Sequence, residues 1–181
     1  LKDHKRRYGS IRLLPQLAAI HLNDTHPALA VPELMRLLID ENGMSWEEAW
    51  AVTTSVCAYT NHTVLAEALE TWPEDLIARK LPRIYSILKE INRRFCEDLW
   101  KRFPGDWDKI SRMAIISYNV VKMANLSVYG SHCVNGVSKL HSDIIKKSIF
   151  RDFYDYTPEK FTNVTNGIAH RRWLNQSNPE L

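Results

Sequence analysis

Hydrophobic and polar positions along this chain alternate in a way that predicts short strands as well as helices. The apolar run at 17–22, bounded by Pro15 and Asn23, is typical of a buried strand. The polar residues at 23–27 would then form the loop at the carboxyl end of that strand, where ligands collect in open α/β folds. We therefore expect an α/β fold whose first strand leads into a binding loop.

Helical spacing dominates the next stretch. Pro32 fits the first turn of a helix that stops at 42–43, where an Asn-Gly pair stands. Ser45 and Glu48 match a capping box, and the helix that they open carries a buried stripe reaching Tyr59. The pattern thus predicts two successive helices, with the second ending just after Tyr59.

The longest helical pattern lies in the middle of the chain. A helix opens at Pro73, the pair at 81–82 bends or restarts it, and apolar residues keep helical spacing from Ile84 to Phe103. The remaining chain predicts a short strand at 113–117 and then a segment at 121–129 whose spacing favours a helix, while its composition also suits a strand. It further predicts a turn at Asn135-Gly136, a helix with Val137, Leu140, Ile144 and Ser148 on one face, and an irregular aromatic segment at 150–166.

The composition fits a globular domain: the chain has 181 residues, of which 45% are hydrophobic, and a net charge of +3. Such a small charge favours a solvated surface over a nucleic-acid site. No apolar stretch approaches the ~20 residues of a membrane span, so we expect no membrane partner. Cys57, Cys96 and Cys133 lack metal-site spacing and fit a reducing cytoplasmic location.

Three polar clusters carry the candidate chemistry: L-N-D-T-H-P at 22–27, A-Y-T-N-H-T at 58–63 and T-N-G-I-A-H-R-R-W-L at 165–174. Each combines amides, hydroxyls, a histidine or an acid at the edge of an apolar run, which suits a neutral ligand rich in hydroxyl groups. The sequence contains none of the common nucleotide-binding, serine-hydrolase or zinc-protease motifs. The residues alone predict a sugar-compatible α/β domain without a metal site.

Simpler interpretations apply to each cluster taken singly. Asp24 and Thr25 could be ordinary turn residues that bond nearby backbone amides. His62 could satisfy the carbonyls at a helix end. Three further histidines lack a second ligand at metal spacing: His132, His141 and His170.

Taken together, the clusters closely resemble the α-glucan phosphorylases, the family of glycogen, starch and maltodextrin phosphorylases. The resemblance covers nearly the whole chain and includes F-P-G-D-W-D-K from 103 and G-S-H-C-V-N-G-V from 130. It implies that 1–165 form the later part of a Rossmann-like N-terminal domain of the glycosyltransferase-B type. Residues 166–181 would cross toward a C-terminal domain.

The resemblance also implies an activity. Members of the family transfer the terminal glucosyl unit of an α-1,4-glucan to phosphate, giving glucose 1-phosphate with retention. His62 matches the histidine whose side chain and carbonyl hold that unit, and Asn166 matches the asparagine that binds its 6-hydroxyl. The resemblance places five further residues near the glucan or the sugar: Asp24, His26, Thr63, Asn135 and Val137. Amide and neutral imidazole groups suit an oxocarbenium-like transition state, because they bind hydroxyls without adding a competing cation.

By the same resemblance, the enzymes use pyridoxal 5'-phosphate through its phosphate group, and the complete protein would be a cytoplasmic homodimer. The cofactor lysine and the residues that hold substrate phosphate belong to the C-terminal domain, and no part of this chain matches them. A function of another class stays open, namely a non-catalytic glucan-binding or structural α/β module. The preference between glycogen and maltodextrin and the regulation by effectors also stay open.

Overall fold

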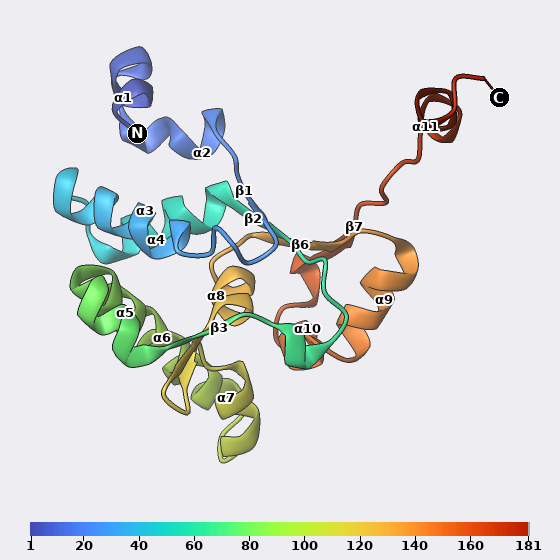
Figure 1. The fold of residues 1–181 in the computed structure, drawn as a ribbon. Coiled ribbons are helices and arrows are strands. Elements are labelled where there is room, and N and C mark those ends of the chain that lie inside the picture. Colours follow the sequence, from blue (N-terminus) through green and yellow to red (C-terminus); the bar gives the residue numbers. More distant parts are fainter. Residues whose placement is uncertain (181) are drawn as a thin grey trace.

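The computed structural model describes residues 1–180 and contains a four-stranded parallel sheet (Figure 1). The strands lie in the order β1, β2, β6, β7, so their order in the sheet follows their order in the chain. Their bounds are Ile20–Asn23, Cys57–Thr60, Cys133–Gly136 and Phe161–Asn163. Because every pair is parallel, the four carboxyl ends lie at one edge of the sheet. The predicted α/β class is confirmed.

A second, antiparallel sheet has the order β3, β5, β4, with bounds Thr71–Pro73, Val120–Lys122 and Ile116–Ser117. Figure 1 shows helices α3 to α6 gathered on one side of the molecule and α9 on the other. The α-helices are α1 Lys2–Tyr8, α2 Leu14–Leu17, α3 Ala30–Arg36, α4 Trp46–Val56, α5 Glu74–Lys80, α6 Pro82–Arg102, α7 Trp107–Met113, α8 Met123–Tyr129, α9 Lys139–Lys147, α10 Arg151–Tyr156 and α11 His170–Ser177. A π-helical turn, Leu37–Glu41, continues α3, and short 3₁₀ turns occupy Ile11–Leu13, Ala66–Ala68 and Pro158–Lys160.

Alternation along the parallel strands separates a buried face from a polar one. One row of paired residues is apolar and buried: Leu22, Tyr59, Val134 and Phe161. The next row is polar: Asn23, Thr60, Asn135 and Thr162. Since successive side chains of a strand point to opposite faces, the apolar row anchors the sheet in the core, while the polar row lies at the carboxyl edge with Thr60 buried.

The predicted helices of the middle region are confirmed. The capping box of α4 is present, since Ser45 accepts from the amide of Glu48 and the Glu48 carboxylate accepts from the amide of Ser45. Helix α6 begins at Pro82 and buries a stripe at helical spacing: Ile84, Ile87, Leu88, Ile91, Phe95 and Leu99. Each such side chain contributes about 1.5–3 kcal/mol on full burial, which makes α6 the main packing partner of its neighbours.

Two predicted boundaries near the first strands are wrong. Strand β1 begins at Ile20 rather than at Leu17, which ends α2 and is 49% exposed. Tyr59 lies in β2 and not on the preceding helix, because α4 ends at Val56 and the chain continues directly as a strand. Over a few residues, a helix and a strand would both bury Tyr59, so the apolar pattern does not distinguish them. The pairing of Tyr59 with Leu22 of β1 makes this segment a strand.

The predictions for residues 113–166 need four corrections. The pair Asn135-Gly136 is not a turn but the end of β6, where both residues pair with β7. Leu140 is 72% exposed, since α9 buries the neighbouring face with His141 and Ile145. The segment 150–166 is not wholly irregular, because it contains α10 and β7. The stretch 113–117 is also only partly a strand, since α7 ends at its first residue.

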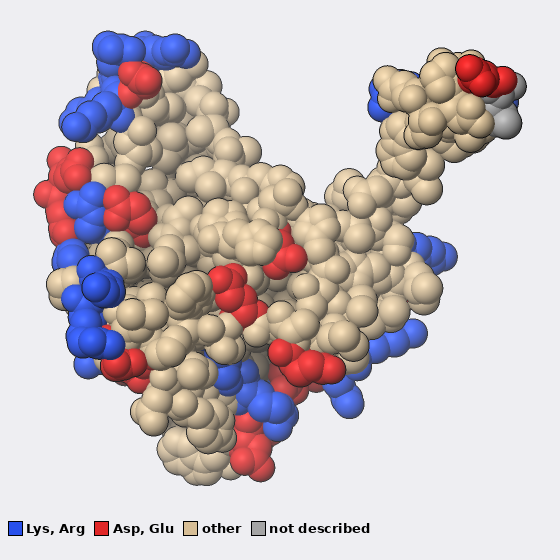
Figure 2. Space-filling model, viewed as in Figure 1, with Lys and Arg blue, Asp and Glu red and all other residues tan. Residues whose placement is uncertain are grey.

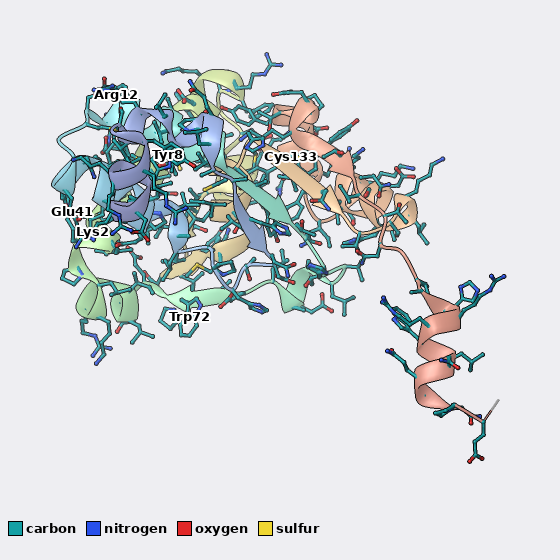
Figure 3. The ribbon with its side chains drawn as sticks, turned by 90° about the horizontal axis from the view of Figure 1, so that it is seen from above. Lys2, Tyr8, Arg12, Glu41, Trp72 and Cys133 are labelled. Carbon is teal, nitrogen blue, oxygen red and sulfur yellow. The ribbon has the colours of Figure 1, made fainter. Side chains whose placement is uncertain are left out.

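The chain leaves the body after β7. Residues 164–180 are all exposed, and α11 buries none of its side chains. Figure 2 shows this segment as a projection from the body, and Figure 3 shows the same separation in a view turned by 90°. Figure 2 also shows acidic and basic side chains interspersed over the α3 to α6 side, where Arg83 pairs with Asp40 and Arg94 pairs with Glu47.

Candidate functional site

The first two polar clusters and the start of the third lie at the carboxyl edge of the parallel sheet. The first follows β1, the second follows β2, and the third follows β7. The backbone extends the pairing past the strands, since the amide of Asp24 donates to the Thr60 carbonyl at 2.9 Å and that of Asn61 donates to the Asn135 carbonyl at 3.0 Å. Loops far apart in the sequence are therefore joined into one edge.

His62 is exposed at this edge, and its imidazole is oriented by one neighbour. Its Nε2 lies 2.6 Å from Oδ1 of Asn23. An amide oxygen only accepts, so the Nε2 atom carries the proton and donates it to Asn23. The neutral ring then presents Nδ1 as a hydrogen-bond acceptor, which is the form that can bind a hydroxyl group of a ligand.

A second chain of hydrogen bonds crosses three neighbouring strands, β1, β2 and β6. The Thr60 hydroxyl donates to Oδ1 of Asn135 at 2.7 Å, and Nε2 of His21 lies 2.7 Å from the same hydroxyl. Because the single Thr60 proton is used toward Asn135, His21 is the donor in its contact. The amide nitrogen of Asn135 in turn donates to the Gly136 carbonyl at 3.0 Å. The amide of Asn135 is thereby fixed in orientation.

Two buried polar residues support the loops from beneath. Asn61 is fully buried and His141 is 7% exposed. Nε2 of His141 lies 3.1 Å from Oδ1 of Asn61, and its Nδ1 accepts from the Val137 amide at 3.1 Å. Oδ1 of Asn61 also accepts from the Thr63 amide at 3.1 Å. Thr63 and Val137, two of the predicted sugar neighbours, are thus tied to one pair of side chains.

Sequence reasoning missed Asn61 and treated His141 as uninformative. The signal was present in the face of α9. If the buried face of this helix is shifted by one residue from the predicted one, His141, Ser142 and Ile145 point inward. These are the residues that α9 buries in the structure. A histidine and a serine on the buried face of a helix must find polar partners, and that need points to a hydrogen-bonded cluster behind the loops.

Asp24 forms a turn immediately after β1, at the carboxyl edge of the parallel sheet. Its backbone has φ 59°, in the left-handed region, and its Oδ1 accepts from the Thr25 amide at 2.6 Å. The Thr25 hydroxyl donates to Glu70 at 2.5 Å, and Nε1 of Trp72 donates to the same carboxylate at 2.8 Å. The interpretation of Asp24 and Thr25 as turn residues is therefore correct locally, while the turn itself lies within the candidate site.

His26 faces a different part of the surface from His62. It lines a hollow of about 290 Å³ together with Thr25, Glu70, Trp72 and Lys80. Figure 3 shows Trp72 at the periphery of the molecule. Within residues 1–180, no hydrogen bond links the His26 side chain to the other predicted site residues.

Among residues 1–180, Asn166 is held only through its backbone. Its amide donates to the Val137 carbonyl at 3.1 Å, which keeps the residue near the edge, while its side chain is exposed. The neighbouring Thr165 hydroxyl accepts from Asn163 at 3.1 Å. The site therefore joins His62, Thr63, Asn135 and Val137 closely and attaches Asn166 more loosely.

Burial governs the ionisable groups behind the site. It raises the pKa of the Tyr59 phenol well above its usual range and the pKa of the Cys57 thiol to about 11, so both stay protonated at neutral pH. Burial also lowers the pKa of Lys160 to about 8. The Lys160 amine donates to the carbonyls of Val128 and Tyr129 at the end of α8, away from the carboxyl edge of the sheet.

The described chain offers no obvious ligand set for a metal or a pyridoxal group at this edge. No three His, Cys, Asp or Glu side chains come together as a metal site among residues 1–180. The partly buried Lys160 caps a helix and does not face the edge. Over the same residues, no helix is both long and apolar enough to cross a membrane.

Comparison with known proteins identifies relatives along the entire sequence. The family of carbohydrate phosphorylases matches residues 1–181. The chain is 55% identical to glycogen phosphorylase of Bacillus subtilis over 181 residues, which is 100% of this chain and 23% of that protein. It is also 55% identical to the muscle forms of sheep (Ovis aries) and human (Homo sapiens) over 170 residues, covering 92% of this chain and 20% of each relative.

The chain thus spans about a fifth of the length of these relatives. The match reaches from the first helix to the α11 segment and includes each polar cluster at the sheet edge. This chain belongs to the carbohydrate phosphorylase family.

Proposed function

We propose that this chain is part of an α-1,4-glucan phosphorylase and supplies the glucose-binding side of its active site. The observation that carries the proposal is the assembly of His62, Asn135 and Val137 at one sheet edge in a member of the phosphorylase family. The reaction would transfer the terminal glucosyl unit to inorganic phosphate and release glucose 1-phosphate with retention.

The residues of this chain would act by binding and orienting the sugar. His62 offers an Nδ1 acceptor because its other nitrogen donates to Asn23. Asn166 offers an amide whose exposed side chain is free to bind the 6-hydroxyl. Thr63, Asn135 and Val137 would surround the ring, with Asp24 and His26 along the path of the glucan. Fixed dipoles of this kind stabilise a developing positive charge without reorganising during the reaction.

The cofactor would be bound by residues outside this chain. Pyridoxal 5'-phosphate would supply a phosphate group next to the substrate phosphate. Among residues 1–180 the geometry of Lys160 does not suit a cofactor linkage, since its amine caps α8. We therefore derive no step from the cofactor and assign it to a further domain, toward which residues 166–181 would lead from the domain at 1–165.

The proposal extends to location and assembly. Cys57, Cys96 and Cys133 are all free thiols, which supports a reducing, cytoplasmic location. The complete protein would form a homodimer. A non-catalytic glucan-binding or structural module is the alternative, and it differs in having no turnover.

One experiment separates these functions. The complete reading frame that encodes these residues and the isolated 181-residue chain are each incubated with maltoheptaose, phosphate and pyridoxal phosphate, and glucose 1-phosphate is measured. We expect turnover by the complete protein and none by the isolated chain, since half of the site is missing from it. Binding of maltoheptaose without turnover by the complete protein would favour the non-catalytic module. Turnover by the isolated chain, after host enzyme is excluded, would contradict the division of the site between domains.

A further inference from the structure

Two loops of the candidate site rest on a single buried imidazole. The loop after β2 carries His62 and Thr63, and the loop after β6 carries Val137. His141, at the first turn of α9, contacts both: Nδ1 accepts from the Val137 amide and Nε2 lies against Asn61, each at 3.1 Å. The amide of His141 itself donates to the Ser138 hydroxyl at 3.1 Å, which fixes the start of the helix.

The protonation state of this imidazole follows from its two partners. The Val137 N–H group points at Nδ1, so Nδ1 holds a lone pair. The neutral ring then carries its proton on Nε2, which suits the amide oxygen of Asn61. Asn61 completes the chain, because its amide nitrogen donates to the Tyr59 hydroxyl at 3.0 Å. Every nitrogen and oxygen of the two side chains therefore has a partner, as a buried polar network requires.

The network connects the buried Tyr59 of β2 with the backbone of two loops. Asn61 and Thr63 are the two neighbours of His62 in the chain. Oδ1 of Asn61 accepts from the Thr63 amide, so the side chain of one neighbour holds the backbone of the other. Positions 61–65 have no helical or strand structure of their own. The position of this backbone thus depends on the hydrogen bonds of Asn61, and through them on His141.

The packing of α9 against the sheet leaves no space between Gly136 and Ser142. A Cβ atom at Gly136 would come within 2.7 Å of the Ser142 hydroxyl and 2.8 Å of its amide nitrogen. The end of β6 therefore packs directly against the first turn of α9. Because His141 lies on that turn, the imidazole is held at a fixed distance from the sheet edge.

We propose that His141 and Asn61 are positioning residues for the phosphorolysis proposed above, on which this inference rests. They set the separation between the His62 loop and the Val137 loop and so the width of the glucose pocket. They act through the backbone of Thr63 and Val137 and do not touch the sugar.

The test uses the complete protein with maltoheptaose and phosphate. His141→Gln keeps a donor toward Asn61 and loses the acceptor for Val137, whereas His141→Asn keeps the acceptor and loses the reach to Asn61. His132→Gln is the matched control, because His132 is an exposed histidine at the opposite end of β6. Measured quantities are kcat, KM for maltoheptaose, KM for phosphate and Tm.

We expect each His141 variant to lose about 10- to 100-fold in kcat, since displacements near 1 Å in a preorganised site have effects of this size. KM for phosphate should stay within about twofold, because the phosphate would be held by another domain. His132→Gln should match the wild type. Asn61→Leu and the double variant His141→Gln/Asn61→Leu are measured as well. The double variant should lose little more kcat than the worse of its two single variants, since the effects of contacting residues are not additive.

Wild-type kcat in a folded His141 variant, with only Tm lowered, would overturn the positioning role. Failure of both variants to fold would overturn it too, because His141 would then serve folding alone. Absence of phosphorolysis in the wild-type protein is a different result, which would refute the proposed function itself.

Discussion

His62 and Asn166 lie at the same sheet edge but are held in different ways. The His62 loop is bonded to Asn23 through the imidazole and to the buried Asn61 through its backbone. Asn166 has one backbone hydrogen bond to Val137, and the segment around it is exposed throughout. One half of the candidate site is therefore preorganised, while the other half is attached to the sheet edge by one backbone hydrogen bond among the described residues.

The largest effect should come from the preorganised half. We expect His62→Ala in the complete protein to lower the rate of phosphorolysis by about 10²–10³, as for losing one positioned polar group in a fixed site. The fold should be unaffected because His62 is exposed. Steady-state assays next to His132→Ala, an exposed histidine outside the site, give the measurement. Equal rates for the two variants would remove His62 from the reaction.

The loosely attached half should show selectivity instead. Asn166→Ala is expected to lower the rate by about 10- to 100-fold on glucan ends bearing glucose, because a group that bonds a hydroxyl discriminates against its absence. On ends bearing 6-deoxyglucose, the variant and the wild type should have similar rates. Asn175→Ala, another exposed asparagine of the same segment, is the control. Equal losses on both substrates would indicate that Asn166 only shapes the backbone.

Substitution of one glycine in each half of the site tests how tightly that half is packed. Gly136→Ala should lower the free energy of unfolding by about 1–3 kcal/mol, because the added methyl meets the backbone of Ser142. Gly167→Ala should change it by less than about 0.5 kcal/mol, since no atom lies within 4 Å of the new Cβ. Urea unfolding of both variants measures the difference. A tolerated Gly136→Ala would show that β6 and α9 can separate at little cost.

The smallest effect concerns α11. In the isolated chain, Trp173→Ala should shift the free energy of unfolding by less than about 0.5 kcal/mol, because the side chain is 49% exposed and α11 buries none of its residues. In the complete protein the same change should cost more if α11 packs against a further domain. The measurement is the change in the free energy of unfolding caused by Trp173→Ala in each of the two proteins. A large loss of stability in the isolated chain would contradict the exposed position of α11.

Local signals predicted the helices of the middle region well. Pro82 and the Ser45–Glu48 capping box mark helix starts by their own chemistry, whatever the rest of the chain does. The end of α4 could not be read in the same way, since Tyr59 enters a strand only because β1 is there to pair with it. Asn135-Gly136 has the sequence of a turn, yet β7 converts it into a strand end.

The site was predictable to the extent that its residues sit in recognisable clusters. The resemblance pointed to His62 and Asn166, and the topology places both near one edge. The supporting pair of Asn61 and His141 could not be found locally, because the two residues lie 80 positions apart and meet only when α9 packs on the sheet. Their roles depend on tertiary geometry rather than on any local motif.

The hydrogen bonds between β2 and β6 can form only late in synthesis of the chain. Thr60 leaves the ribosome well before Asn135, its hydrogen-bond partner 75 positions later. At about 5–20 residues per second, roughly 4–15 s pass before the second residue exists. During that interval one side of β2 has no strand to pair with and remains open to other chains. That side of β2 is therefore unpaired from the synthesis of Thr60 until the synthesis of β6.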